Sequence, residues 1–181
     1  LSSQKMGDEE SEQAAALLKM IGDLERISDH AVNVLNSTEE LRQKGYTLTE
    51  DAIKELDILT GATKEILDIT FKALKDTDTE IAKRVQPLEQ VIDIIKEKMR
   101  THHIRRMQQG LCTIEAGFVW SDLLTDLERV SDHCSNIAGC LIDASMHNLS
   151  IHETQRIAED TSSDYVKLFK DYSKKYSFSN I

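Results

Sequence analysis

The chain has 181 residues, 40% of them hydrophobic, which is enough apolar material for one large domain or two small ones. Its formal net charge of −10 argues against nucleic-acid binding, because "HHIRRM" at residues 102–107 is the only basic cluster. No run of about 18 apolar residues suggests a membrane span, and three cysteines without zinc-type spacing indicate reduced thiols in a cytosolic protein.

The sequence predicts an all-α fold, an antiparallel bundle of long helices. It contains only seven glycines and one proline, and helix-forming residues dominate. Apolar residues recur at three- and four-residue steps, and no alternating pattern marks a strand. In chain order we expect helices over residues 11–44, 49–75, 79–109 and 113–146, and a weaker helical tail over 150–160 and 164–176.

Local signals predict where these helices begin and end. Thr47 opens a capping-box pattern, with Thr49 as an alternative N-cap, and Thr77 opens a second box. Pro87 lies two turns inside the third helix, where it predicts a kink and not a stop. Gly110 is expected to end that helix as its C′ residue.

One string of residues occurs twice in the chain. "DLERISDHAVNV" begins at Asp23 and "DLERVSDHCSNI" begins at Asp126, and eight of the twelve positions are identical. The same shift pairs Gly7 with Gly110, the glycine that ends the third helix. The first long helix is therefore the counterpart of the fourth, and the chain is an internal duplication.

The register of the repeat divides the chain into three parts. Residues 1–46 are expected to be the last helix of a first repeat that is truncated at its N-terminus and lacks about two helices. Residues 1–6 would then be the stub of a lost helix. Residues 47–148 form a complete second three-helix repeat, and residues 149–181 form a C-terminal helical tail.

Each copy of the string carries an acidic pair one helical turn apart. Glu128 and Asp132 share a face beside the apolar seam of their helix, and Glu89 and Asp93 repeat this spacing on the antiparallel helix before it. Four carboxylates around one point repel each other unless a cation lies between them. Oxygen-only ligation suits hard cations or iron and not a structural zinc site. The first copy offers the corresponding pair Glu25 and Asp29.

Other polar members of the string have expected roles near these acids. Arg26 and Arg129, with Asn33 and Asn136, are expected to support the metal ligands from behind, although the arginines could equally form ordinary surface salt bridges. His30 and His133 fall on a different helix face, so surface exposure or inter-helix hydrogen bonding is expected for them rather than metal ligation. His102 and His103, far along the third helix, are expected at the surface.

The string resembles the signature of the PhoU family, phosphate-transport regulators built from two three-helix repeats. The longer stretch from "HHIRRM" through "GLCTIEAG" to "DLERVSDHCSNIAG" is similar to the cytoplasmic PhoU-like domain of bacterial Na⁺/phosphate cotransporters. The resemblance covers about residues 1–145. It implies metal clusters on ExxxD motifs. The ligands of a complete site would be Glu89, Asp93, Glu128 and Asp132. Half of a second site would consist of Glu25 and Asp29.

The resemblance implies a regulatory domain without enzymatic activity, at the cytoplasmic face of the membrane and attached to the transmembrane part of a phosphate transporter. The implied cofactor is a metal cluster, with iron expected first and zinc, manganese or magnesium as alternatives. A homodimer could cover the exposed apolar face of the first helix. The alternative functions are a free-standing phosphate-uptake regulator and a metal-independent helical scaffold. A ferritin-like di-metal enzyme would need Glu-x-x-His pairs, which the string lacks.

Overall fold

The computed structural model describes residues 7–146 and 151–178, and the all-α prediction is confirmed. No strand occurs in these described segments. In chain order the helices are α1 (Asp8–Gln43), α2 (Glu50–Asp76), α3 (Thr79–Ala82), α4 (Val85–Gln108), α5 (Ile114–Met146) and α6 (Ile151–Lys175). No helix in the described part of the chain is long and apolar enough to cross a membrane.

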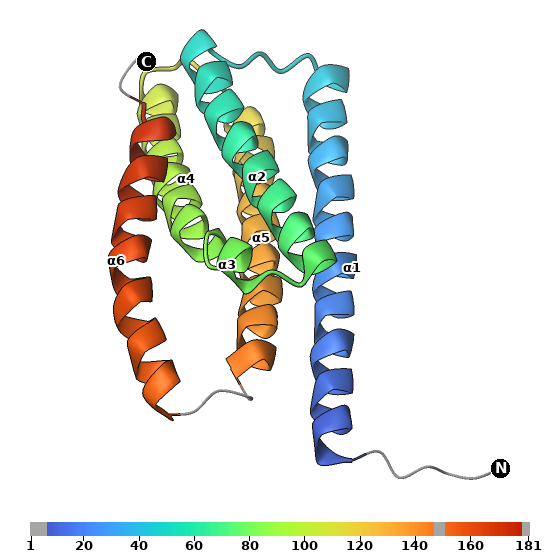
Figure 1. Cartoon of the computed structure of the whole chain (residues 1–181). Helices are drawn as coiled ribbons and strands as arrows, with labels where there is room; N and C mark the ends of the chain where they lie inside the picture. The colour runs from blue at the N-terminus through green and yellow to red at the C-terminus, as the bar shows by residue number, and fades with distance from the viewer. Residues whose placement is uncertain (1–6, 147–150, 179–181) are drawn as a thin grey trace, which may run out of the picture.

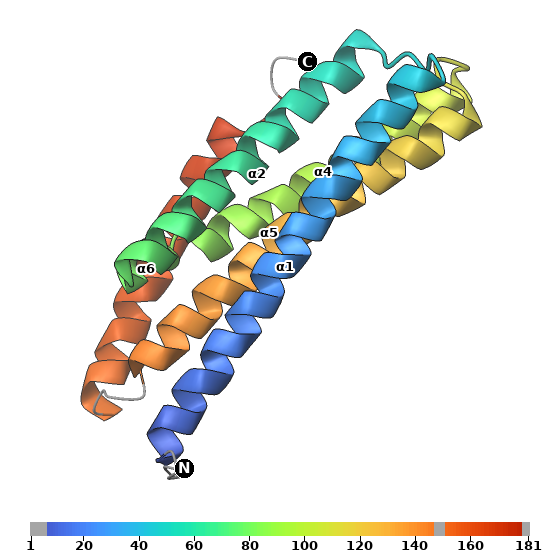
Figure 2. The ribbon, with the colours of Figure 1, turned by 90° about the vertical axis from the view of Figure 1, so that its right-hand side faces the viewer.

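Helix α5 lies at the centre of the bundle (Figures 1 and 2). It packs against α1 on one side and against α2 and α4 on the other, while α6 packs on the outside of α4. The core lies where α2, α4 and α5 meet, and its largest fully buried side chains include Leu59, Ile66, Leu88, Ile92, Trp120, Leu123 and Ile137. All three cysteines are free thiols. The three-helix unit of α2, α4 and α5 therefore forms most of the core, with α1 and α6 added at its sides.

The N-caps of α2 and α3 differ in part from the expected ones. Thr49, the alternative N-cap of α2, accepts a hydrogen bond from the backbone N–H of Ala52 at 3.2 Å. Before α3 the cap is Asp78, whose carboxylate accepts from the backbone of Ile81 at 3.0 Å. Thr77 cannot cap α3, because it ends α2 in the left-handed conformation with φ of 51°.

The sequence predicted that Pro87 would kink one long helix, and this prediction is wrong. Helix α3 ends at Ala82 and α4 begins at Val85, so the chain breaks before the proline. In a continuous helix the Pro87 ring would clash with the carbonyl of Lys83. As the third residue of α4, it lies among the first four residues, whose N–H groups have no partner within a helix.

Gly110 ends α4 as the sequence predicted. Its φ of 69° lies in the left-handed region, and its N–H donates to the Met107 carbonyl at 3.0 Å. The next N–H, that of Leu111, donates to the Arg106 carbonyl at 3.0 Å, which completes a Schellman motif. The turn then reverses the chain, so α4 and α5 lie antiparallel and can present their acidic pairs to each other (Figure 1).

The C-terminal tail forms one helix, α6, and not two short segments as predicted. Tyr172 is buried against the core, and Lys175 forms an ion pair of 2.8 Å with Glu65 on α2. The Tyr176 hydroxyl donates to the same Glu65 carboxylate. These contacts hold the C-terminal part of α6 to the three-helix unit.

Candidate metal centre

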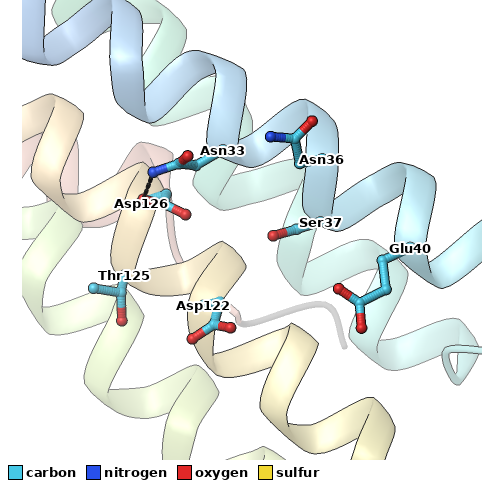
Figure 3. Close-up of a pocket in the computed structure, with 7 residues that line it drawn as sticks. All are labelled: Asn33, Asn36, Ser37, Glu40, Asp122, Thr125 and Asp126. Atoms are coloured by element: carbon cyan, nitrogen blue, oxygen red, sulfur yellow. Dashed lines mark hydrogen bonds between the residues drawn. The ribbon is translucent and has the colours of Figure 1, made fainter.

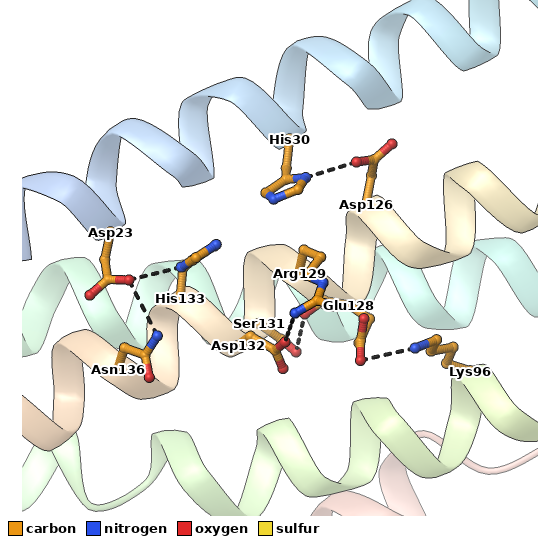
Figure 4. Close-up of polar contacts among 10 residues, drawn as sticks. All are labelled: Asp23, His30, Lys96, Asp126, Glu128, Arg129, Ser131, Asp132, His133 and Asn136. Carbon is orange, nitrogen blue, oxygen red and sulfur yellow. Dashed lines mark hydrogen bonds and ion pairs between the residues drawn. The ribbon is translucent and has the colours of Figure 1, made fainter.

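The two copies of the repeated string face each other where α1 lies against α5 (Figure 4). His30 Nδ1 lies 2.8 Å from Asp126 Oδ1, so the imidazole donates to the carboxylate across the interface. Asn33 donates its amide to the same oxygen at 3.2 Å. His30 and Asn33 come from the first copy of the string and Asp126 from the second.

The reciprocal set of contacts lies farther along the same α1–α5 interface. His133 Nδ1 lies 2.8 Å from Asp23 Oδ1, and Asn136 donates to that oxygen at 3.2 Å. The His30 and His133 rings stack between the two sets, with centroids 5.6 Å apart. The duplicated helices are thus related by a pseudo-twofold axis near the stacked rings. The expectation of inter-helix hydrogen bonding by the histidines is confirmed.

A polar hollow of about 370 Å³ lies between α1 and α5, next to the bond between Asn33 and Asp126 (Figure 3). Its remaining lining consists of acidic, hydroxyl and amide side chains, namely Asn36, Ser37, Glu40, Asp122 and Thr125. At this end of the pair, α1 therefore meets α5 through polar groups rather than through apolar packing.

The acidic pairs of the second repeat come together between α4 and α5. One carboxylate oxygen from each of Glu89, Asp93 and Asp132 lies within 4.8 Å of the other two, a suitable spacing for ligands of one cation. All three side chains are partly buried. Glu128 lies outside this group of three, because its Oε1 forms an ion pair with Lys96 of α4 at 2.9 Å (Figure 4).

This cluster is poorly compensated by positive charge. Burial, followed by the negative charges of Asp93, Asp132 and Glu128, raises the pKa of Glu89 to about 7. Burial and the charge of Glu128 also raise the pKa values of Asp93 and Asp132. Asp93 Oδ1 and Glu128 Oε2 are buried and have no hydrogen-bond partner among the described residues. A cation held here would supply the missing charge and use these free oxygens, so the residues fit a metal.

The family can be identified from comparisons with known proteins. A family model described as the PhoU domain matches residues 1–38 and 56–141, which is more than half of the chain. The chain belongs to the PhoU family. It is 31% identical over 121 residues to a Thermotoga maritima protein called phosphate-specific transport system accessory protein PhoU homolog 1. The match covers 67% of this chain and 51% of the relative, so the chain spans about half of its length. No solved structure matches.

Of the other predicted site residues of this PhoU chain, one contacts the acidic cluster and the rest lie elsewhere. Arg129 donates to Asp132 at 3.3 Å, a contact that fits both of its expected roles, support of a ligand and an ordinary salt bridge. Asn33 and Asn136, which we expected near the metal ligands, donate instead across the α1–α5 interface. Among the described residues, the acid pair and arginine of the first copy belong to no metal-capable cluster and are exposed; these are Glu25, Asp29 and Arg26.

The sequence did not reveal the buried charge network at the other end of α4. His103 is buried and His102 bonds to Glu55 of α2, so the prediction that both histidines lie at the surface is wrong. Arg106 also pairs with Glu55 at 2.9 Å and lies over the Trp120 ring. The sequence signal for this network was Glu55, an acid among the apolar positions of α2. The sequence did not indicate that Arg106 would be its partner.

In the metal-free protein we expect the contribution of Glu89 to stability to fall as the pH rises from about 4.5 to 7. The pKa of Glu89 is about 7 in the folded state, whereas the unfolded carboxyl releases its proton near the ordinary value of 4.5. The folded state therefore binds more protons in this window, and raising the pH favours unfolding. Urea midpoints measured in chelator across this range test the trend. Glu89→Gln is expected to flatten it, whereas the exposed control Glu12→Gln keeps the wild-type slope.

Proposed function

We propose that this PhoU chain is a non-enzymatic regulatory unit of phosphate transport whose bundle holds metal ions at Glu89, Asp93, Asp132 and Glu128. The observation that carries the proposal is the cluster of partly buried, oxygen-only donors with unpaired atoms. The name of the Thermotoga maritima relative supports the phosphate-transport role. Iron is the metal expected first, with zinc, manganese and magnesium as alternatives, because oxygen donors suit hard cations.

The chemistry of the cluster supports a structural or signalling ion more than a ferritin-like enzyme. Glu128 would join the ligands by exchanging Lys96 for the metal. His133, the imidazole nearest in sequence to these acids, is bonded to Asp23 on the opposite side of α5. The Glu-x-x-His ligand pair of ferritin-like sites therefore has no equivalent in this cluster. The metal would neutralise the acids that destabilise the bundle, which links metal loading to the rigidity of α4 against α5.

Metal titration of the chelated protein tests the proposal. We expect iron, zinc or manganese to raise the thermal unfolding midpoint and to bind stoichiometrically, because a ligand that binds only the folded state stabilises it. The triple variant Glu89→Gln, Asp93→Asn, Asp132→Asn is expected to lose both effects.

The duplication supplies a matched control for this experiment. Glu25→Gln with Asp29→Asn removes the same acid pair from the first copy, where both side chains are exposed and no second pair lies opposite among the described residues. This variant is expected to keep the wild-type metal content. Equal metal content in the triple variant and the wild type would refute the metal site.

Two settings for this regulatory unit are proposed, both at the cytoplasmic face of the membrane. The printed name of the relative favours a free-standing accessory protein. The "GLCTIEAG" stretch at residues 110–117 favours a domain attached to a Na⁺/phosphate cotransporter. Its last glycine, Gly117, packs so closely that an added Cβ would lie 2.9 Å from His103 Nε2. Membrane-spanning segments encoded directly upstream in the gene would decide for the attached domain, and their absence would decide against it.

We further propose that a second copy of the chain covers the exposed face of α1. Leu17, Ile21 and Leu35 on this face are each more than half exposed. Their counterparts in the second repeat, Trp120, Leu124 and Ala138, are buried where α5 packs in the bundle. The α1 face therefore has the composition of a packed interface.

The oligomeric state measured by light scattering after size exclusion tests this pairing. The wild type is expected to be a dimer, and Leu17→Lys with Ile21→Lys is expected to be a folded monomer. Phe71→Lys, at an exposed apolar position on α2, is the control and is expected to stay dimeric. A wild type that remains monomeric at high concentration would contradict the proposal.

A further inference from the structure

A cavity of about 590 Å³ lies between α4 and α5, farther toward the C-terminal end of α4 than the acidic cluster. Its volume falls within the range of small-molecule binding sites. Residues that define its character include Lys96, Arg100, His103, Phe118, Trp120 and Ser121. We propose that this cavity binds an organic phosphate of nucleotide size, with its phosphate at Lys96 and Arg100 and its flat body against Phe118.

The charge of the cavity favours an anion although the chain as a whole has a net charge of −10. Lys96 and Arg100 are one turn apart on α4 and therefore share a helix face. Arg100 is exposed and forms no ion pair with any residue that the structure describes. Among the residues whose side chains are described, Lys96 pairs only with Glu128, at the boundary with the acidic cluster. The cavity thus offers one free guanidinium and one ammonium to a phosphate, the groups that phosphate recognition in proteins uses most.

An apolar part of the cavity lining, contributed by both α4 and α5, is open to a ligand. Phe118 and Ile114 of α5 are each 68% exposed, and Ile104 of α4 is 46% exposed. All three line the cavity, so an apolar patch directly adjoins the two cations. Inorganic phosphate alone would leave this patch uncovered, whereas a nucleoside would cover it and could use the Ser121 hydroxyl. The pairing of an aromatic platform with phosphate-binding cations selects a nucleotide-like ligand.

The floor of the cavity is rigid and carries unused polar atoms. His103 and Trp120 stack with ring centroids 5.8 Å apart, and Arg106 lies over the Trp120 ring at 5.5 Å. Glu55 holds Arg106 in place through their ion pair. Trp120 Nε1 and His103 Nε2 are buried without a hydrogen-bond partner among the described residues. Such a floor is preformed, which lowers the ordering cost of binding.

Trp120 is the only tryptophan of the chain and lines this cavity, so its fluorescence can report on binding there. Titration with adenosine monophosphate in chelator is expected to change the emission saturably. Arg100→Gln is expected to weaken binding about tenfold, as the loss of one charge-assisted hydrogen bond implies. Phe118→Ala is expected to weaken it as well. Arg105→Gln is the matched control, because Arg105 is exposed on α4 but lines a different hollow.

The ligand series separates the proposal from its competitors. Adenosine, which lacks the phosphate, and inorganic phosphate, which lacks the body, are each expected to bind far more weakly than the nucleotide. No saturable response to the nucleotide, equal binding of adenosine, or an unchanged affinity of Arg100→Gln would each overturn the site. The variant that lacks the three cluster acids is expected to retain nucleotide binding, so this site can fail or hold independently of the metal centre.

Discussion

Glu55→Ala is expected to lower the free energy of unfolding by about 3–5 kcal/mol, the cost of breaking a buried ion pair. Glu55 is 2% exposed, its Oε2 lies 2.9 Å from Arg106 Nη1, and its Oε1 lies 2.5 Å from His102 Nδ1. Removal of the acid leaves the buried Arg106 guanidinium without a counter-charge. Arg106 Nη2 already has no hydrogen-bond partner among the described residues, and the Trp120 ring beneath the guanidinium supplies no counter-charge.

Urea unfolding at constant pH measures this loss. Asp57→Ala, an exposed acid on the same helix, is the control and is expected to change stability by less than about 0.5 kcal/mol. The double variant Glu55→Leu with Arg106→Met is expected to recover much of the loss, because no buried charge then remains unpaired. A loss below about 1 kcal/mol in Glu55→Ala would show that water reaches the pair.

Asp23→Ala is expected to cost about 2–4 kcal/mol and to loosen α1 from α5, because one carboxylate accepts two inter-helix hydrogen bonds there. The Asp23 side chain is 8% exposed and accepts from His133 and Asn136. Asp126→Ala is expected to cost less, since the Asp126 side chain is 14% exposed and its partner His30 is more exposed than His133. Asp23→Asn is expected to recover part of the loss by keeping an acceptor oxygen.

Hydrogen exchange along α1, together with urea unfolding, would detect the effect of Asp23→Ala. Glu25→Ala, an exposed acid two residues farther along α1, is the control and is expected to leave exchange unchanged. Double-mutant cycles on the Asp23–His133 and Asp126–His30 pairs would give the two coupling energies separately. If both cycles gave zero coupling, the two histidine–aspartate bonds would contribute nothing to the interface.

Local chemistry made much of the fold readable before the tertiary structure was known. Helical periodicity placed four of the long helices, and Gly110 ended α4 because a left-handed residue is required there. The effect of Pro87 was recognised but misjudged, since its constraint on the preceding residues broke the helix where a bend was expected. The N-caps Thr49 and Asp78 were not singled out by the sequence, because a neighbouring residue could act as the cap in each case.

The residues of the candidate site also divide into those that helical spacing predicts and those that it does not. Spacing of four residues is enough to put Glu89 beside Asp93, and the short Gly110 turn is enough to bring that pair toward Asp132. Helical spacing also separates the histidines of the string from its acids. It does not identify the helix that each face meets, so neither the Asp23–His133 bond nor the burial of His103 could be derived.

The properties of the repeated string are therefore of two kinds, those set by the order of residues and those set by the packing of the helices. The all-α class, the duplication and the acidic pairs follow from the order of residues, because helix formation and its period of 3.6 residues are local properties. The pairing of the two copies about stacked histidines, the link from Glu128 to Lys96 and the buried Glu55 network follow only from the tertiary structure. Contacts between helices depend on which faces are brought together by packing, and that choice minimises the free energy of the whole bundle rather than of any one segment.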